Sequence, residues 1–148
     1  MAMNHPENAR VERCPATDFR PAASLENLRC RAELLARLRR FFADRGFLEV
    51  ETPLLSADTV VDRHLDPFSV SCGETAADGP RWLQTSPEFA MKRLLAAGAT
   101  AIYQVTRAFR QDEAGPRHNP EFTMVEWYRA GDGMAEAMQR TSDLAEML

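Results

Sequence analysis

Two alternating segments lie on either side of a polar loop within residues 106–128, and this arrangement predicts an antiparallel β-hairpin. The loop, AGPRHNP, supplies the glycine, asparagine and prolines with which a chain reverses its direction. Successive side chains of a strand point to opposite faces. One face of the hairpin is therefore expected to carry Gln104, Thr106, Ala108, Arg110 and Asp112 from the first segment, and Phe122, Met124, Glu126 and Tyr128 from the second.

This face is too polar for an ordinary core, because it offers an arginine, two acids and two aromatic rings. A half-exposed antiparallel pair whose polar face meets water is the simpler interpretation, and the pattern alone favours it. A pocket with both charge signs would instead suit a pair of ligands that carries both, such as a nucleoside triphosphate beside an amino acid.

The 148 residues are 45% hydrophobic, which is enough for one compact domain with its own core. No segment is apolar enough to span a bilayer, and the polar N-terminus has no signal-peptide pattern, so we expect a soluble, cytoplasmic protein without a membrane partner. The net charge is −4, and Lys92 is the only lysine among 18 basic residues, which do not form a basic block. This balance argues against a broad nucleic-acid surface but allows a local phosphate clamp.

Neither cysteine nor histidine spacing indicates a metal site. Cys14, Cys30 and Cys72 are odd in number and far apart, so we interpret them as reduced structural thiols rather than as a disulfide framework. His64 lies between charged residues, and we assign it no role.

Residues 1–23 are expected to form an irregular N-terminal arm, because prolines interrupt any helical period, and residues 24–148 a single domain. Ser24 is a plausible N-cap for a helix that ends near Gly46. A strand over 47–51 follows and ends before Pro53. The apolar positions expected to face inward from the helix are Leu28, Ala32, Leu35, Leu38 and Phe42.

Further strands are expected over 67–71 and 81–85. Ser86 is expected to cap the next helix, with Pro87 at its first position, Glu88 in its first turn, and an end near Ala97 before Gly98. Its inward side chains would be Met91, Leu94 and Leu95. A last helix begins at Asp132 or Gly133 and offers Met134, Ala137, Met138, Leu144 and Leu148 for packing.

Three segments together resemble the class II lysyl-tRNA synthetases and their shorter paralogue, the elongation factor P lysine ligase. FRQDE followed by RHNPEFTMVEWY resembles motif 2, RRFFADRGFLEVETPLL resembles motif 1 at the dimer interface, and QTSPEFAMKRLLAAG resembles the segment that holds the amino acid. The resemblance implies an α+β fold in which helices flank an antiparallel sheet, as in the class II catalytic domain. It covers only the N-terminal part of that domain, with motifs 1 and 2.

The resemblance also implies an activity, the ATP-dependent activation of lysine to an aminoacyl-adenylate. Arg110 matches the motif 2 arginine that contacts the α-phosphate, a catalytic role that suits a planar, always charged guanidinium. Phe122 matches the ring on which adenine stacks, and Asp112 stands where the family has a glutamate. If the strand continued, Glu113 would point to the opposite face. Other residues matched to the nucleotide are Gln111, Arg117, His118 and Asn119.

The amino-acid site implied by the resemblance consists of Ser86, Pro87 and Glu88, with Glu88 at the α-ammonium group, and of Glu126 and Tyr128 at the side-chain ammonium. Several of the site residues have a structural alternative. Ser86 and Glu88 serve a helix start, Phe122 could pack in a core, Glu126 could pair with an arginine, and the loop with Arg117 and His118 could be solvated.

The TSPE sequence and the short N-terminal arm, which could not form an anticodon-binding barrel, favour the elongation factor P lysine ligase type. This type implies lysine or β-lysine and elongation factor P as substrates, a homodimer, and ATP with Mg²⁺, whose ligands we expect outside this chain. We expect weak or no turnover from this part of the domain alone. The alternatives are a fragment of a tRNA-charging lysyl-tRNA synthetase and a noncatalytic dimerisation or binding module.

Overall fold

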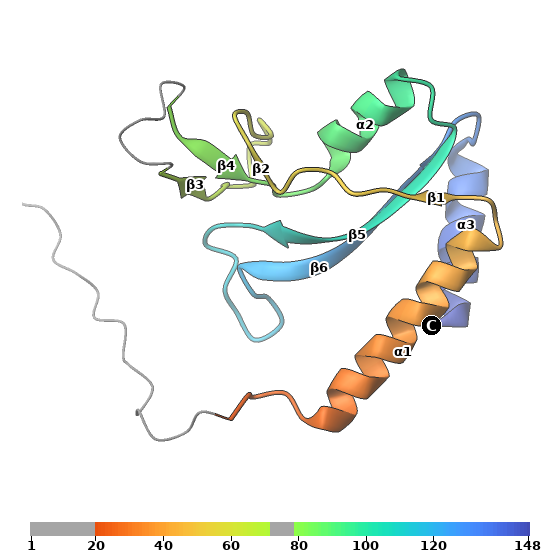
Figure 1. Ribbon diagram of the computed structural model, residues 1–148, viewed down its shortest axis with the longest axis horizontal. Coiled ribbons are helices and arrows are strands. Elements are labelled where there is room, and N and C mark those ends of the chain that lie inside the picture. Colours follow the sequence, from red (N-terminus) through yellow and green to blue (C-terminus); the bar gives the residue numbers. More distant parts are fainter. Residues whose placement is uncertain (1–19, 72–78) are drawn as a thin grey trace, which may run out of the picture.

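The computed structural model describes residues 20–71 and 79–148, which form three helices and six strands in two small sheets. One sheet has the order β1-β5-β6 and the other the order β2-β4-β3. Figure 1 shows β5 and β6 as a long curved ribbon, with α2 over one face and α1 and α3 at the other.

The first helix, α1 (Leu25–Ala43), begins as predicted. The Ser24 side chain accepts the N–H of Asn27 at 3.1 Å, and Gly46 takes a positive φ of 73° just after the helix. Only the C-terminal half of α1 is buried, through Leu38, Phe41 and Phe42. The inward positions predicted for the first half were wrong, since Leu28 and Ala32 are exposed.

β1 (Leu48–Glu49) is shorter than predicted and pairs in parallel with β5 (Ala101–Phe109). β5 pairs antiparallel with β6 (Glu121–Arg129) along its whole length, from Ala101 opposite Arg129 to Phe109 opposite Glu121. This sheet is therefore mixed, which corrects the prediction of a purely antiparallel sheet, while the α+β class stands. The parallel pair follows because the chain returns through α2 before it enters β5.

The second sheet is antiparallel and consists of β2 (Leu55–Ser56), β3 (Ser69–Val70) and β4 (Arg81–Leu83). The strands predicted over 67–71 and 81–85 correspond to β3 and β4, and β2 was not predicted. It follows Pro53 directly and has only two residues, so it lacks an alternating pattern. The loop between β3 and β4 contains Cys72, which, like Cys14, lies outside the described residues.

The second and third helices are α2 (Glu88–Ala96) and α3 (Met134–Met147). Gly98 follows α2 with a φ of 106°, as a helix stop requires. Met91 of α2 is fully buried, and Leu94 and Leu95 are half-buried. In α3, Leu144 is buried, but Met134 and Met138 are 80% and 64% exposed, so their predicted packing role was wrong.

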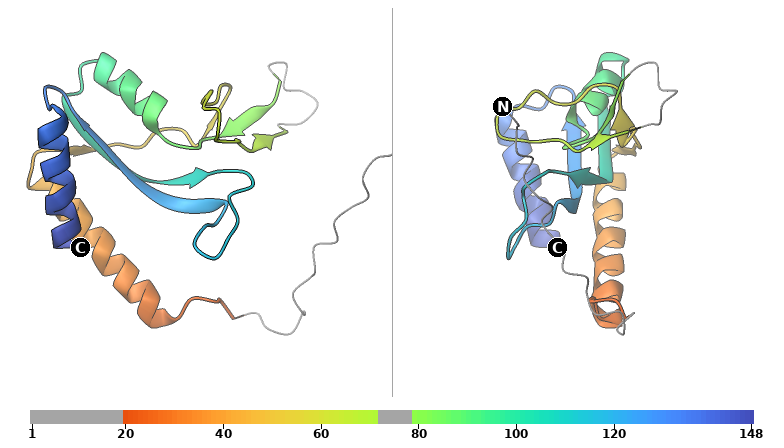
Figure 2. Two further views of the ribbon diagram at one scale, coloured as in Figure 1. Left: turned by 180° about the vertical axis from the view of Figure 1, so that it is seen from behind. Right: turned by 90° about the vertical axis from the view of Figure 1, so that its left-hand side faces the viewer.

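The main core lies between α1, α3 and the face of the hairpin that carries its odd-numbered residues. Phe42 is its centre, stacked on Tyr103 with ring centroids 4.4 Å apart. Trp127 lies 5.5 Å from the same ring, and the other buried members are Leu38, Phe41, Phe47 and Leu144. Figure 2 shows α1 and α3 on the same side of the β5–β6 ribbon. The even-numbered face is thereby left for α2 and the candidate site.

Candidate active site

The register of β5 and β6 brings the even-numbered residues of both strands to one face. Gln104 lies opposite Glu126, Thr106 opposite Met124, and Ala108 opposite Phe122. Directly paired residues of an antiparallel ladder point to the same side. The shared face predicted for these positions is thus confirmed, and the segment between β4 and α2 runs along it.

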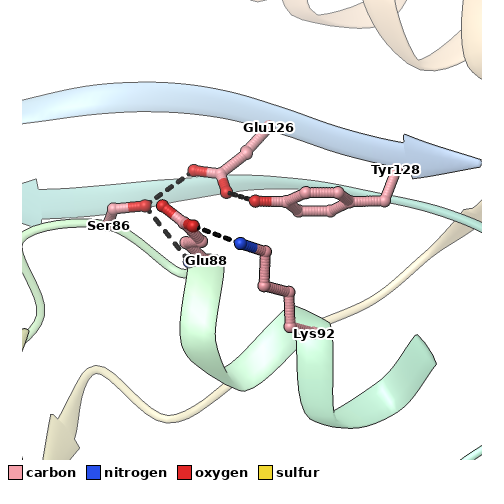
Figure 3. A network of polar contacts seen from close by, with 5 residues as sticks. All are labelled: Ser86, Glu88, Lys92, Glu126 and Tyr128. Carbon is pink, nitrogen blue, oxygen red and sulfur yellow. Dashed lines mark hydrogen bonds and ion pairs between the residues drawn. The ribbon is translucent and has the colours of Figure 1, made fainter. Parts of the chain in front are cut away.

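Ser86, Glu126 and Tyr128 form a hydrogen-bonded group at one end of this face (Figure 3). The Ser86 hydroxyl donates to Glu126 Oε2 at 2.7 Å, and the Tyr128 hydroxyl donates to Glu126 Oε1. Both oxygens of the Glu126 carboxylate are therefore oriented by neutral donors. Its charge is not paired with an arginine, lysine or histidine within the part of the chain that the structure describes, which removes the alternative of an arginine pair there.

Glu88 begins α2 next to this group. Its backbone N–H donates to Ser86 Oγ at 3.1 Å, so one hydroxyl connects the helix start to Glu126. The helix begins at Glu88 and Pro87 is its N-cap, which corrects the predicted start by one position: Ser86 is not the N-cap and Pro87 is not the first helical residue. Pro87 is fully buried, which fixes the backbone between Ser86 and Glu88.

Burial raises the pKa of the Tyr128 hydroxyl, and the hydrogen bond to Glu126 and the negative charges of Glu126 and Glu88 raise it further. Tyr128 therefore stays a neutral donor. The charges of Glu126 and Glu88 both act on this hydroxyl, so two carboxylates lie at this end of the face. Such a site favours a ligand with ammonium groups.

Arg110 and Phe122 lie toward the other end of the face. The Arg110 guanidinium carbon is 5.2 Å from the centroid of the Phe122 ring, and Arg110 Nε donates to the Thr85 carbonyl at 3.4 Å. Both side chains are half-buried. A planar cation beside an aromatic ring can receive a phosphate and a base together.

The prediction that Asp112 shares a face with Arg110 on a continuing strand was wrong. The strand ends at Phe109, and Asp112 takes a positive φ of 61°, so Asp112 does not continue the alternation. The condition under which Glu113 would point to the opposite face, a continuing strand, is not met, and its carboxylate lies 3.7 Å from Arg110 Nη1. The turn thus puts an acid beside the guanidinium, although it is Glu113 and not Asp112.

The remaining nucleotide candidates lie in the loop. Gln111 donates its N–H to the Asp66 carbonyl at 2.7 Å, and Gly115 and His118 bond to each other through their backbones. The side chains of Gln111, Arg117, His118 and Asn119 are exposed. The structure does not bring them into contact with Arg110 or Phe122, so their assignment to a nucleotide remains a prediction.

Lys92 lies at the site and escaped sequence reasoning, while further contacts are made by residues that the sequence placed there. Lys92 Nζ is 2.5 Å from Glu88 Oε1, a pair that the i,i+4 spacing of the two residues could have indicated. Gln104 is buried opposite Glu126 and accepts the Thr52 hydroxyl at 3.0 Å. Ser86 also lines a pocket of about 410 Å³, together with residues of the segment 53–61 and of α2.

None of the helices among the described residues is both long and apolar enough to cross a membrane. Within residues 20–71 and 79–148, no three histidine, cysteine, aspartate or glutamate side chains gather as they would around a metal ion. His64 is exposed, as is Cys30, which is a free thiol on the surface rather than a buried structural one.

Comparisons with known proteins agree with the motifs at this site. A family profile described as class II tRNA synthetases (D, K and N) matches residues 8–148. An elongation factor P (R)-β-lysine ligase of Pasteurella multocida is 50% identical over 133 residues, which are 88% of this chain and 41% of the relative. A ligase of the same name from Yersinia enterocolitica is 53% identical over 132 residues, with the same two shares.

The chain spans about two fifths of the length of these curated relatives. The profile nevertheless covers nearly all of the chain, including the hairpin, α2 and the segment that joins them. The protein therefore belongs to the class II tRNA synthetase family, in its D, K and N group, and is similar there to the elongation factor P lysine ligases.

Proposed function

We propose that this chain carries the amino-acid site and part of the ATP site of an elongation factor P lysine ligase. In this reaction the carboxylate of lysine or β-lysine attacks the α-phosphate of ATP, which gives an aminoacyl-adenylate and pyrophosphate. The amino acid then passes to a lysine of elongation factor P. The observation that carries the proposal is the group of Ser86, Glu126 and Tyr128 on the same hairpin face as Arg110 and Phe122.

The amino-acid end suits a diamine because it offers two carboxylates. An ammonium group that leaves water needs an opposite charge and hydrogen-bond acceptors. Glu126 would take the side-chain ammonium, since Ser86 and Tyr128 orient both of its oxygens without neutralising its charge. Glu88, at the start of α2, would take the α-ammonium.

The nucleotide end suits a phosphate beside a base. Arg110 would bond α-phosphate oxygens and offset the negative charge that develops at phosphorus during the attack. Phe122 would stack on adenine, a contact worth roughly 1–3 kcal/mol for bases on aromatic side chains. The Arg110 guanidinium would exchange its contact with Glu113 for the phosphate, because the 3.7 Å pair is long and partly exposed to water, and therefore weak.

No step is assigned to Mg²⁺, because the described residues do not include a set of ligands for it. Alignment of the two substrates and charge stabilisation are the contributions that this chain's own residues can make. A chain that spans 41% of its relatives is proposed to bind substrates with weak or no turnover.

Isothermal titration calorimetry with L-lysine, β-lysine and ATP tests the proposal. We expect saturable binding of lysine that Glu126→Gln abolishes, and binding of ATP that Arg110→Ala weakens. Thr123→Ala is a suitable control, because Thr123 is exposed and lies between Phe122 and Met124 on the opposite face. Absence of lysine and ATP binding in a folded protein would favour a noncatalytic module. Robust lysine-dependent pyrophosphate exchange would contradict the weak turnover.

A further inference from the structure

Lys92 is the only lysine of the chain, and its ammonium lies at the proposed amino-acid site. Lys92 extends from α2 toward Glu88, and its Nζ is 2.5 Å from Glu88 Oε1 (Figure 3). The side chains of Lys92 and Glu88 are 53% and 44% exposed, so water reaches both. A primary ammonium thus already bonds the carboxylate that is proposed to receive a substrate ammonium.

We propose that Lys92 is an internal competitor of the substrate's α-ammonium group for the Glu88 carboxylate. The inference rests on the proposed function, because it assumes that a diamino acid binds between Glu88 and Glu126. Binding of that ligand would move the Lys92 ammonium away from Glu88. Lys92 therefore sets how strongly the site holds a ligand with an α-ammonium group.

The two carboxylates differ in how their charges are compensated. Glu126 accepts hydrogen bonds from the neutral hydroxyls of Ser86 and Tyr128, whereas Glu88 bonds a full positive charge. An ammonium group that approaches Glu126 meets a negative charge that no cation among the described residues balances. An ammonium group that approaches Glu88 is repelled by the Lys92 ammonium and must displace it.

The ligand can displace Lys92 because the ion pair between Lys92 and Glu88 is exposed. An ion pair at i,i+4 on a helix surface is weak and reversible. A ligand anchored at Glu126 by its side-chain ammonium holds its α-ammonium close to Glu88, which raises the local concentration of the competing group. A ligand without an α-ammonium group has no reason to displace Lys92.

The simpler explanation is that Lys92 only stabilises α2, as many Glu–Lys pairs at this spacing do. The pair of Glu33 and Arg37 in α1 has the same spacing and similar exposure, and it lies outside the proposed site. Arg37→Met therefore serves as a matched control for Lys92→Met. A helix-stabilising role predicts no change in ligand affinity from either substitution.

Calorimetry with L-lysine and 6-aminohexanoate separates these roles, because 6-aminohexanoate carries the side-chain ammonium alone. We expect Lys92→Met to bind L-lysine about two- to fivefold more tightly than the unsubstituted protein. Binding of 6-aminohexanoate should stay unchanged, and Arg37→Met should match the unsubstituted protein with both ligands. An unchanged or weaker affinity for L-lysine, or an equal gain for both ligands, would overturn the inference.

Nuclear magnetic resonance gives a direct measurement, since growth on lysine labelled with ¹⁵N at the ε position labels the Lys92 ammonium alone. Saturating L-lysine is expected to shift this signal toward its position in a Glu88→Gln variant, which lacks the ion pair, and 6-aminohexanoate is expected to leave it in place. A signal that stays in place while calorimetry shows L-lysine bound would overturn the inference and leave the proposed function standing. Failure of every variant to bind L-lysine would overturn both.

Discussion

Ser86 and Glu126 are 40 positions apart in the sequence, and the Ser86 hydroxyl donates to Glu126 Oε2 at 2.7 Å. The same hydroxyl accepts the Glu88 N–H at 3.1 Å. One small side chain therefore links the start of α2 to the middle of β6 and orients an acid of the hairpin. Without it, the Glu126 carboxylate would keep only the Tyr128 hydroxyl as a donor among the described residues.

Ser86→Ala is expected to weaken lysine binding about tenfold. The variant removes a hydrogen bond to a charged group, and such bonds contribute roughly 1.5–3 kcal/mol, of which about 1.4 corresponds to a factor of ten. Calorimetry with L-lysine measures the change. Ser69→Ala is the control, because Ser69 is exposed in β3. Equal affinities of the two variants would show that Glu126 does not need Ser86.

Arg110→Lys is expected to weaken ATP binding about tenfold even though the charge is kept. The guanidinium fork can bond two phosphate oxygens at once, whereas an ammonium acts as a point charge. The matched control is Arg107→Lys, since Arg107 lies nearby in β5, is exposed and pairs with Glu121 at 3.5 Å. Titration of ATP into each variant tests the difference, and a similar loss in both would argue against a specific role of Arg110.

Phe42→Ala is expected to destabilise the protein by about 3–5 kcal/mol, because it leaves a cavity at the centre of the core. Phe42 is fully buried, and the rings of Phe41, Phe47, Tyr103 and Trp127 lie within 5.5 Å of it, centroid to centroid. Met134→Ala should change the stability by less than about 0.5 kcal/mol, since Met134 is exposed. Urea unfolding measures both values. A large loss in Met134→Ala would mean that this surface is covered in solution.

The stability should fall between pH 10 and pH 12, partly through Tyr103. Burial and the hydrogen bond to Glu49 raise the pKa of Tyr103 from 10.0 to about 12. In this range the unfolded chain loses the proton and the folded chain keeps it, so the free energy of unfolding decreases as the pH rises. Below pH 10 the contribution is constant. Urea unfolding at pH 9, 10 and 11 should show a smaller decrease for Tyr103→Phe; an unchanged slope would contradict this assignment.

Asp112→Glu is expected to destabilise the protein by about 0.5–1 kcal/mol, although it restores the residue that the family motif contains. Asp112 has a φ of 61°, and aspartate tolerates this left-handed conformation better than residues with longer side chains. Asp112→Gly should not be destabilising in the same way, because glycine adopts positive φ freely. Thermal unfolding compares the two variants. A more stable glutamate variant would show that the turn readjusts.

The sequence predicted best those parts of the fold that depend on local patterns. The alternation in β5 and β6 gave the shared face, and Ser24, Gly46 and Gly98 marked helix ends correctly. These features follow from side-chain period and from backbone conformations that few residues adopt. The functional roles came from a family resemblance, and the structure shows only that Ser86, Glu126 and Tyr128 lie together, as do Arg110 and Phe122.

The errors concern features that tertiary contacts decide. The parallel pairing of β1 depends on where the chain returns after α2, and two-residue strands such as β2 carry no period. Met134 and Met138 have the helical spacing of core residues, yet α3 packs through Leu144. Asp112 was wrongly placed on the shared face because it leaves the extended conformation, which no pattern before it indicates.

Because of the β5–β6 register, alternate residues of the hairpin have two different roles. Val125 and Trp127 pack against the core, and the positions between and beside them, Met124, Glu126 and Tyr128, face α2 and the candidate site. A saturation mutagenesis experiment along β6 should therefore give two interleaved profiles. At Val125 and Trp127, substitutions that change the apolar volume would lower the protein's abundance. At the even positions, substitutions would abolish ligand binding in proteins that accumulate normally.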